Sequence, residues 1–596
     1  SLLYHQTYIM KKTTILLLAV TTSLLLVNCK SEEKKQDFSS LTKDYFDDKN
    51  ALDPLAATQN GQNEYNDQLQ FEMTDSYRKL QASFFDKYQT ALQSIAVEGL
   101  NKEQKNSYEI IKWEVEIGKE LLKQPTNLLP VHQFGGTHLT MGQFAGGTSA
   151  QPFKTEKDYT NFLQRMDIYA VWIDSAMVYM KKGIDKGVVL PKALTLKLIP
   201  QFTEMATPNI EDNLFYSSIQ LMPASFPESI KKDLTAKYTA TINTKLIPQY
   251  KKMADFLIKE YLPASRATSG IGSLPFGNNL YDTYAKQWTT TEMTPSEIHE
   301  LGLKEVARLN AEMEKVKTQV GFKGTLLEFF EEVRNKKELK PFKKPEEVIT
   351  NFQSIYSRIK PNVDKLFSLQ PKTKFEIRRT EAFREKTASA EYNQGTADGT
   401  RPGIFYVPIP DVANYNTYGD EDLFLHEAIP GHHFQISLQQ ENKSLPDFRK
   451  FNWFGAYGEG WALYTESLGK ELGLYQDPYQ YFGMLSNEMH RAIRLVVDTG
   501  LHSKGWTREQ AIKYSLANEA ESEASIIPEI ERYMAIPGQA LSYKIGQLKI
   551  MELRKKAETK MGAKFDIRKF HEKVLESGVM PLALLEKKIN EWIEGK

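Results

Sequence analysis

The segment HEAIPGHH, residues 426–433, restricts the folding of this chain more than any other feature. On a regular helix, His432 would face away from His426, and His433 would face the same way about 10 Å further along. Neither pair could share one zinc ion, whose nitrogen ligands lie at about 2.0–2.1 Å. Proline cannot continue a helix and glycine tolerates unusual dihedrals, so we expect the helix to break at the Pro-Gly dipeptide. The break could bring His432, or alternatively His433, next to His426.

Such a break would assemble a zinc site of unusual spacing. In the common H-E-x-x-H arrangement, two histidines on one helix face hold zinc, and the glutamate after the first histidine activates a water molecule. By the same logic, Glu427 is the candidate catalytic base and zinc is the expected cofactor. The alternative is that these side chains are ordinary hydrogen-bonded histidines without a metal.

A third zinc ligand is expected downstream, because catalytic zinc sites usually combine three protein ligands with one open position. The segment 457–466 (YGEGWALYTE) offers Glu459 and Glu466, which lie on one helix face among apolar residues. Carboxylates in such surroundings are costly to bury without a partner. We predict that Glu459 binds the metal and that Glu466 orients a ligating imidazole. The alternative is that both form ion pairs with arginines such as Arg491 or Arg494.

Together these motifs resemble a bacterial family, domain of unknown function 885 (DUF885), which is grouped with the zincin metallopeptidases. Its members carry H-E-x-x-P-G-H-H followed by E-G-W-A-x-Y-x-E, and both patterns occur here, at 426–433 and 459–466. Further segments that resemble the family lie at 398–406, 497–507 and 532–543. The resemblance covers the chain from about residue 45 to its end.

The resemblance implies a mainly helical, two-lobed, zincin-like metallopeptidase fold with a small β-sheet beside the metal-binding helix. It also implies that a tyrosine beyond the third ligand stabilises the oxyanion, with Tyr543 and Tyr533 as candidates, and that Arg532 binds a substrate carboxylate. The alternative for each is an ordinary half-buried core residue. Three more residues in the matching segments are predicted to support the ligands or contact the substrate: Arg401, Asp498 and His502.

The N-terminal residues resemble the signal peptide of a bacterial lipoprotein. Two lysines precede an apolar run over 13–27 that is too short for a membrane-spanning helix, and the tetrapeptide ending in Cys29 resembles a lipoprotein cleavage box. Asn28 departs from the small residue usual at that position. We predict a signal peptide over 1–28, of which 1–9 is a spurious extension, and a lipid on Cys29. The alternative is a plain secretory peptide.

The charged residues after the cysteine predict a flexible tether over 29–45. A lipid anchor and a tether together would place the protein in the cell envelope, attached to the outer membrane and facing the periplasm or the exterior. The membrane is therefore one expected partner.

Apolar residues three to four apart predict helices through most of the chain. A capping box at 294–297 opens one of them, and just before it we place the boundary between an N-terminal helical lobe, 46–290, and a catalytic zinc-binding lobe, 291–596. The glycine-rich stretch 132–147 is predicted to be a loop that either connects helices or reaches the substrate. Residues 403–408 have strand composition, and as an edge strand they could pair with an extended peptide.

Lysine plus arginine total 76, as do aspartate plus glutamate, so the zero net charge offers no basic field for nucleic acid. The leading hypothesis is a zinc-dependent peptidase, similar to carboxypeptidases or oligopeptidases, that acts on peptides outside the cytoplasm. Two alternatives are a peptide-binding lipoprotein without catalysis, and a zinc amidase or esterase acting on cell-wall or small-molecule bonds. The position of cleavage, the side-chain preference and the oligomeric state stay open.

Overall fold

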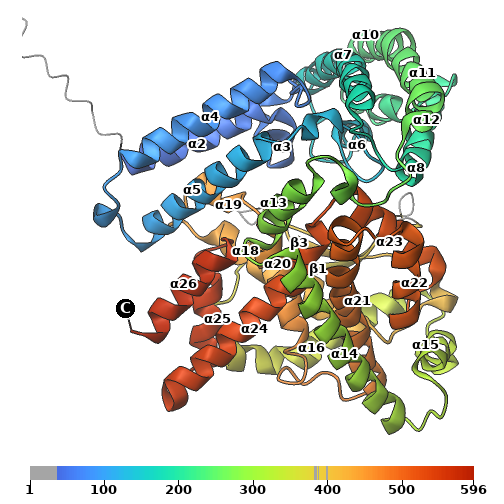
Figure 1. The fold of residues 1–596 in the computed structure, drawn as a ribbon. Helices are drawn as coiled ribbons and strands as arrows, with labels where there is room; N and C mark the ends of the chain where they lie inside the picture. The colour runs from blue at the N-terminus through green and yellow to red at the C-terminus, as the bar shows by residue number, and fades with distance from the viewer. Residues whose placement is uncertain (1–36, 382–384, 387, 397–400, 596) are drawn as a thin grey trace, which may run out of the picture.

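The chain is mainly helical in the computed structural model, which describes residues 37–381, 385–386, 388–396 and 401–595 (Figure 1). The first half contains the helices α2 (Phe38–Leu52), α3 (Pro54–Gln59), α4 (Asp75–Gln93), α5 (Lys102–Leu122), α6 (Thr137–Ala145), α7 (Glu156–Lys186), α8 (Lys192–Thr203), α9 (Ser217–Gln220), α10 (Glu228–Thr241), α11 (Ile247–Phe256), α12 (Leu262–Ala264) and α13 (Gly277–Thr289).

The second half contains the proposed ligands. Its helices are α14 (Pro295–Gln319), α15 (Leu326–Asn335), α16 (Pro345–Leu366), α17 (Asp420–Glu427), α18 (His432–Glu441), α19 (Asp447–Lys450), α20 (Gly455–Glu466), α21 (Pro478–Ser503), α22 (Arg508–Asn518), α23 (Glu523–Ala535), α24 (Ser542–Met561), α25 (Ile567–Leu575) and α26 (Leu582–Ile593). None of the helices in the described ranges combines the length and the apolar composition needed to cross a lipid bilayer.

The two halves share one core. The predicted capping box is present, because Thr294 and Glu297 each accept a hydrogen bond from the other's backbone N–H at the start of α14. Yet a continuous cluster of buried apolar side chains runs from Phe38 in α2 to Ile589 in α26. Figure 1 shows α7, α8 and α10 to α12 at one end of the molecule and α14, α16 and α24 at the other. Since no separate cores mark a boundary near residue 290, the division into two lobes stays a prediction.

Two loop predictions are wrong in part. The predicted tether would reach residue 45, but α2 begins at Phe38 and buries Phe38, Leu41 and Tyr45 at helical spacing. In the glycine-rich stretch, residues Thr137–Ala145 form α6, since Met141 and Phe144 are buried. The predicted signal peptide over 1–28, its extension over 1–9 and Cys29 lie outside the described residues.

A three-stranded sheet lies beside α18, consistent with the expected small sheet near the metal helix. Its strands are β1 (Phe375–Arg379), β2 (Glu391–Asn393) and β3 (Gly403–Val407), in the order β1-β3-β2. β3 is parallel to β1, with Phe375 opposite Gly403, and antiparallel to β2, with Tyr392 opposite Phe405. The prediction of an edge strand at 403–408 is therefore wrong, because both sides of β3 already pair within the sheet.

Candidate metal centre

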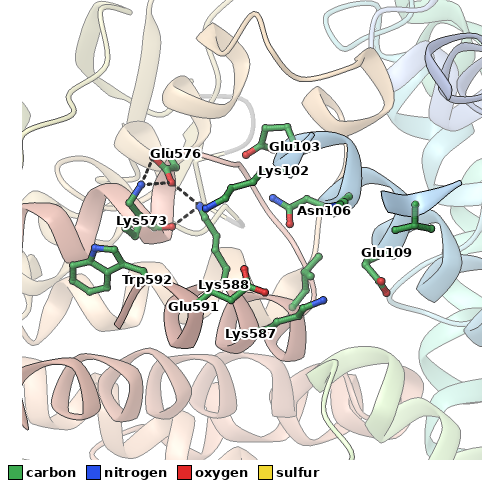
Figure 2. A pocket seen from close by; sticks show the side chains of 13 residues that line it. Lys102, Glu103, Asn106, Glu109, Lys573, Glu576, Lys587, Lys588, Glu591 and Trp592 are labelled. Carbon is green, nitrogen blue, oxygen red and sulfur yellow. Dashed lines mark hydrogen bonds and ion pairs between the residues drawn. The ribbon is translucent and has the colours of Figure 1, made fainter. Parts of the chain in front are cut away.

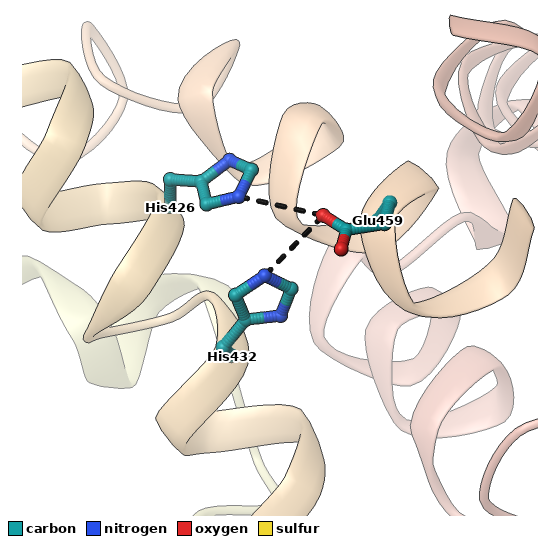
Figure 3. Close-up of side chains that lie close together, drawn as sticks. All are labelled: His426, His432 and Glu459. Carbon is teal, nitrogen blue, oxygen red and sulfur yellow. Dashed lines mark ion pairs between the residues drawn. The ribbon is translucent and has the colours of Figure 1, made fainter. Parts of the chain in front are cut away.

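Two histidines and one glutamate converge where α17, α18 and α20 meet. His426 lies near the end of α17, His432 is the first residue of α18, and Glu459 lies on α20 (Figure 3). Glu459 Oε2 is 3.6 Å from His426 Nε2 and 3.4 Å from His432 Nε2. The three ligand atoms all lie within 4.8 Å of one another. Side-chain exposure rises from 8% for His426 through 11% for His432 to 18% for Glu459, so the open side of the cluster is at the glutamate.

The donor set and its spacing fit a zinc ion. Catalytic zinc sites commonly use imidazole nitrogens and a carboxylate oxygen, which are the three groups present. Two ligands about 2.1 Å from zinc at the tetrahedral angle lie about 3.4 Å apart, which matches the two nitrogen–oxygen distances in the cluster. The imidazole planes of His426 and His432 are perpendicular, with centroids 4.8 Å apart, so both rings can direct a nitrogen at one point.

The predicted helix break places these side chains together. α17 ends at Glu427 and α18 starts at His432. Only glycine fits before His432, because a Cβ atom on Gly431 would lie 1.9 Å from the His426 carbonyl oxygen. Helix α20 satisfies the carbonyls that the break leaves free: Trp461 Nε1 donates to the Pro430 oxygen at 2.9 Å, and Thr465 Oγ1 donates to the Leu425 oxygen at 3.0 Å. Helix α20, which carries Glu459, therefore also stabilises the chain between α17 and α18.

Glu466 lies behind His426, as predicted. Its Oε1 is 2.7 Å from His426 Nδ1, an arrangement that directs Nε2 of the same ring towards Glu459. Asp422 lies next to Glu466 and accepts a hydrogen bond from Asn487 Nδ2 at 2.6 Å. Burial and the adjacent charge of Glu466 raise the pKa of Asp422 well above its usual value. The alternative of an ion pair between Glu466 and Arg494 is wrong, because Arg494 binds Glu529 instead.

The electrostatics of the cluster favour a bound cation. Burial opposes the ionisation of Glu459, yet the two histidines outweigh it and lower the pKa of this carboxyl well below its usual value. Burial also opposes the charge on His426, but Glu459 and Glu466 outweigh it and raise the pKa of its imidazole well above the usual value. The carboxylate therefore stays ionised, and because the pKa of His426 is raised, protons compete with a metal for this imidazole even near neutral pH.

Glu427 lies beside the cluster without joining it. Its Oε1 is 3.9 Å from His426 Nε2, and the residue is buried. Burial raises the pKa of Glu427 above its usual value, although the charges of His426 and His432 act in the opposite direction. A carboxylate with a raised pKa is suited to accepting a proton near neutral pH.

The structure separates the two adjacent histidines, and only His432 belongs to the cluster. His433 points at the sheet, with its Nδ1 2.9 Å from the Tyr392 hydroxyl and its ring against Phe375. β3 can approach it because Gly403 lacks a Cβ, which would lie 2.6 Å from His433 Nδ1. Burial lowers the pKa of His433 to about 4, so it anchors α18 to the sheet as a neutral residue. The prediction of His433 as a metal ligand is corrected accordingly.

Three more predicted site residues have structural partners. Tyr533 accepts a hydrogen bond from Arg494 Nε at 3.1 Å and donates to Glu529 at 2.9 Å, so its hydroxyl is already engaged. His502 accepts from the Ile271 N–H at 3.0 Å and donates to the Tyr533 carbonyl at 2.8 Å. Asp498 accepts hydrogen bonds from the Tyr281 hydroxyl and the Gly538 N–H. These buried groups join helices to one another, and the roles predicted for Tyr533, His502 and Asp498 towards ligands or substrate stay predictions.

The remaining predicted residues are Tyr543, Arg532 and Arg401. The half-buried Tyr543 ring lies 4.6 Å from the Arg494 guanidinium carbon, and its hydroxyl makes no hydrogen bond with another described residue. Arg532 donates to Gln539 Oε1 at 3.0 Å and lies over the Phe134 ring. Arg401 is exposed and donates to the Gln394 carbonyl at 3.3 Å, beside residues 397–400, which are not described.

Several residues of the site were not predicted from the sequence. Asp422 lies four residues before His426, a spacing that places both on one helix face and could have revealed it. Trp461 and Thr465 lie within the predicted motif, but only the fold shows that their side chains donate hydrogen bonds to carbonyl groups around the break between α17 and α18. Trp453, with 44% of its surface exposed, lies 6.0 Å from the His432 ring, and no sequence pattern marked it.

A separate cavity of about 280 Å³ lies between the start of α5 and the helices α25 and α26 (Figure 2). Charged side chains line it, among them Lys102, Glu103 and Lys588. Lys588 Nζ is satisfied by the Lys573 carbonyl at 2.7 Å and Ser577 Oγ at 2.8 Å. None of the residues that line this cavity belongs to the metal cluster, so it is not part of the candidate site.

Comparison with solved structures shows the same fold in two bacterial proteins. The first, described as a "putative lipoprotein from Colwellia psychrerythraea", is 28% identical, with a TM-score of 0.84 over 94% of this chain and 99% of its own. The second, a "putative lipoprotein of unknown function from Shewanella oneidensis", is 18% identical, with a TM-score of 0.74 over 93% of this chain and 100% of its own. A comparison with proteins of curated function found no match. The model of the family described as "Bacterial protein of unknown function (DUF885)" matches residues 54–589, and the chain therefore belongs to this family.

Proposed function

We propose that this protein is a zinc-dependent peptidase of the zincin type. The observation that carries the proposal is the convergence of His426, His432 and Glu459 at the spacing of zinc ligands, with Glu427 beside them. A protein that only bound peptides would have no need of a buried carboxylate at this position. Zinc is the proposed ion because two imidazoles and one carboxylate form a ligand set typical of catalytic zinc.

His426, His432 and Glu459 would hold the ion, and Glu466 would keep the His426 ring in place. When bound, zinc would polarise a substrate carbonyl and lower the pKa of a water molecule. Glu427 accepts a proton on its carboxylate and later returns it to the leaving amine. Tyr543 remains the proposed donor to the developing oxyanion, since its hydroxyl has no hydrogen-bond partner among the described residues.

The proposed substrates are peptides in the cell envelope. The lipoprotein-like sequence around Cys29 and the descriptions of the two similar structures support export and a lipid anchor. Attachment to the outer membrane is part of the same proposal. Replacing Cys29 by alanine should release the protein from the membrane fraction, as measured by fractionation and immunoblotting; continued membrane attachment would contradict the anchor.

Three protein forms test the proposed chemistry: wild type, Glu427→Gln and Glu459→Ala. Wild type should contain about one zinc per chain by elemental analysis and cleave members of a peptide library followed by mass spectrometry. Glu427→Gln should keep the zinc and lose about 10²–10⁴-fold in rate, the usual contribution of a general base. Glu459→Ala should lose the zinc. Unchanged turnover in Glu427→Gln, or a zinc-loaded wild type that cleaves no peptide, would overturn the proposal.

A further inference from the structure

Two arginines lie against the ring of Tyr543, the proposed oxyanion donor. Arg491 and Arg494 are three residues apart on α21 and so project from one face of that helix. Both guanidinium groups lie against the Tyr543 ring, with central carbons 5.8 and 4.6 Å from its centroid. Helix α24, which carries Tyr543, packs directly against α20 next to Glu459, since a Cβ atom on Gly460 would lie 2.5 Å from Gly546. The arginine pair therefore lies on the side of the candidate metal centre where α24 packs against α20.

These arginines have buried donors without acceptors. Arg491 Nε and Arg494 Nη1 make no hydrogen bond with a described residue, and neither does Nε of the nearby Arg532. Arg494 is only 4% exposed, so its side chain is built into the protein. A buried N–H group that loses its water partners costs free energy unless an acceptor replaces them. An acceptor supplied by a ligand would satisfy these donors.

The charges around these donors are unbalanced. Glu529 accepts a hydrogen bond from Arg494 at 2.9 Å and also pairs with Arg532 and His490 at 3.5 Å each, while Glu519 is the nearer partner of His490, at 2.5 Å. Two carboxylates therefore face three arginines and one histidine. Arg491 forms no ion pair with a described residue. The excess charge is positive, and the acceptor that complements it is an anion. Guanidinium groups bind carboxylates through two parallel hydrogen bonds, a geometry that a lysine cannot provide.

We infer that Arg491 and Arg494, with the Tyr543 ring as one wall, bind a carboxylate of the peptide substrate beside the scissile bond. This inference rests on the proposed peptidase function. A peptide can supply the carboxylate from its free C-terminus, which would make the enzyme a carboxypeptidase, or from an acidic side chain near the cleaved bond. The site would then select substrates by charge at a position beside Tyr543.

The test compares matched peptides on the purified full chain loaded with zinc. One apolar peptide is prepared with a free C-terminal carboxylate and as its C-terminal amide; a third carries the amide and a glutamate near that end. We expect kcat/KM for a carboxylate-bearing peptide to exceed that of the plain amide by about 10–100-fold, the usual effect of a charge-assisted hydrogen bond. Whichever carboxylate is preferred, terminal or side-chain, identifies its source.

Arg491→Met should abolish this preference, so that kcat/KM for the two carboxylate-bearing peptides falls to about that of the plain amide measured in the same variant, and Arg491→Lys should restore the preference only in part. Arg568→Met is the matched control, because Arg568 pairs with Asp566 on the surface and lies outside the site. Thermal unfolding checks that each variant is folded. Arg491 is chosen over the more deeply buried Arg494 so that loss of folding does not obscure the result.

Binding separates this inference from the proposed function. Isothermal titration of the same peptides into Glu427→Gln, alone and combined with Arg491→Met, measures carboxylate recognition without turnover. Equal cleavage of acid, glutamate and amide peptides, with equal binding, would overturn the inference and leave the peptidase intact. If no peptide is cleaved, the peptidase proposal fails. In that case, tighter binding of the carboxylate-bearing peptides that Arg491→Met removes would still support the anion site. Equal binding of all three peptides would overturn the anion site as well.

Discussion

Replacing Gly431 by alanine tests whether the break between α17 and α18 positions the proposed metal ligands. The added Cβ would lie 1.9 Å from the carbonyl oxygen of His426 and 2.2 Å from that of Leu425. Real Cβ atoms essentially never approach below 3.0 Å, so the main chain must separate by at least about 1.1 Å. This displacement of the main chain would move His426 and His432 relative to each other. A metal site tolerates changes of only about 0.2 Å in its metal–ligand distances.

We expect zinc affinity to fall by about 100-fold or more, since altering only the partners of metal ligands typically costs about 10–100-fold. Stability should fall by about 1–3 kcal/mol, as for other overpacked interiors. Competition with a chromophoric chelator measures the affinity, and thermal unfolding measures the stability. Gly419→Ala is the control, because Gly419 directly precedes α17 and its added Cβ would be 3.9 Å from its nearest neighbour, Asn487. Equal zinc affinity in the two variants would refute the reasoning.

Two further predictions concern side chains behind the site. Glu466→Gln should weaken zinc binding by about 10–100-fold, because it removes the negative charge behind His426; Glu471→Gln, which lies in the same segment but pairs with Arg554 on the surface, should not. The second concerns Asp498, whose pKa burial raises to about 7. Since the folded state favours the neutral acid, the free energy of unfolding of the wild type should decline as pH rises from about 4 to about 7. The Asp498→Asn variant has no such carboxyl, so by pH 8 its free energy of unfolding should rise relative to wild type by up to about 4 kcal/mol. Urea unfolding at pH 4, 6 and 8 checks this, and a difference independent of pH would contradict it.

The local sequence was informative wherever a few neighbouring residues set the outcome. Apolar spacing predicted a mainly helical chain, and the capping box predicted the start of α14 at Pro295. The Pro-Gly dipeptide predicted the break before His432, because the steric effects of proline and glycine act within one turn. The seven-residue spacing of Glu459 and Glu466 placed both on the face of α20 that meets His426.

Other outcomes depended on contacts between distant segments. After the break, the chain runs so that His432 faces the metal cluster and His433 faces the sheet. Trp461 on α20 and the close approach of Gly403 in β3 stabilise this arrangement. β3 became a central strand because β1, far upstream, pairs with its other side.

The residues around the cluster show the same division. Their types alone made Tyr533, Asp498 and His502 plausible site residues, but packing of α21 against its neighbours gave their polar atoms structural partners. Packing likewise left Nε of Arg491 and Nη1 of Arg494 without acceptors among the described residues. Sequence by itself determined which groups could bind a metal and where the helix must break, because those properties belong to single residues and their neighbours. Only the tertiary structure decided which groups face one another, because that depends on long-range packing.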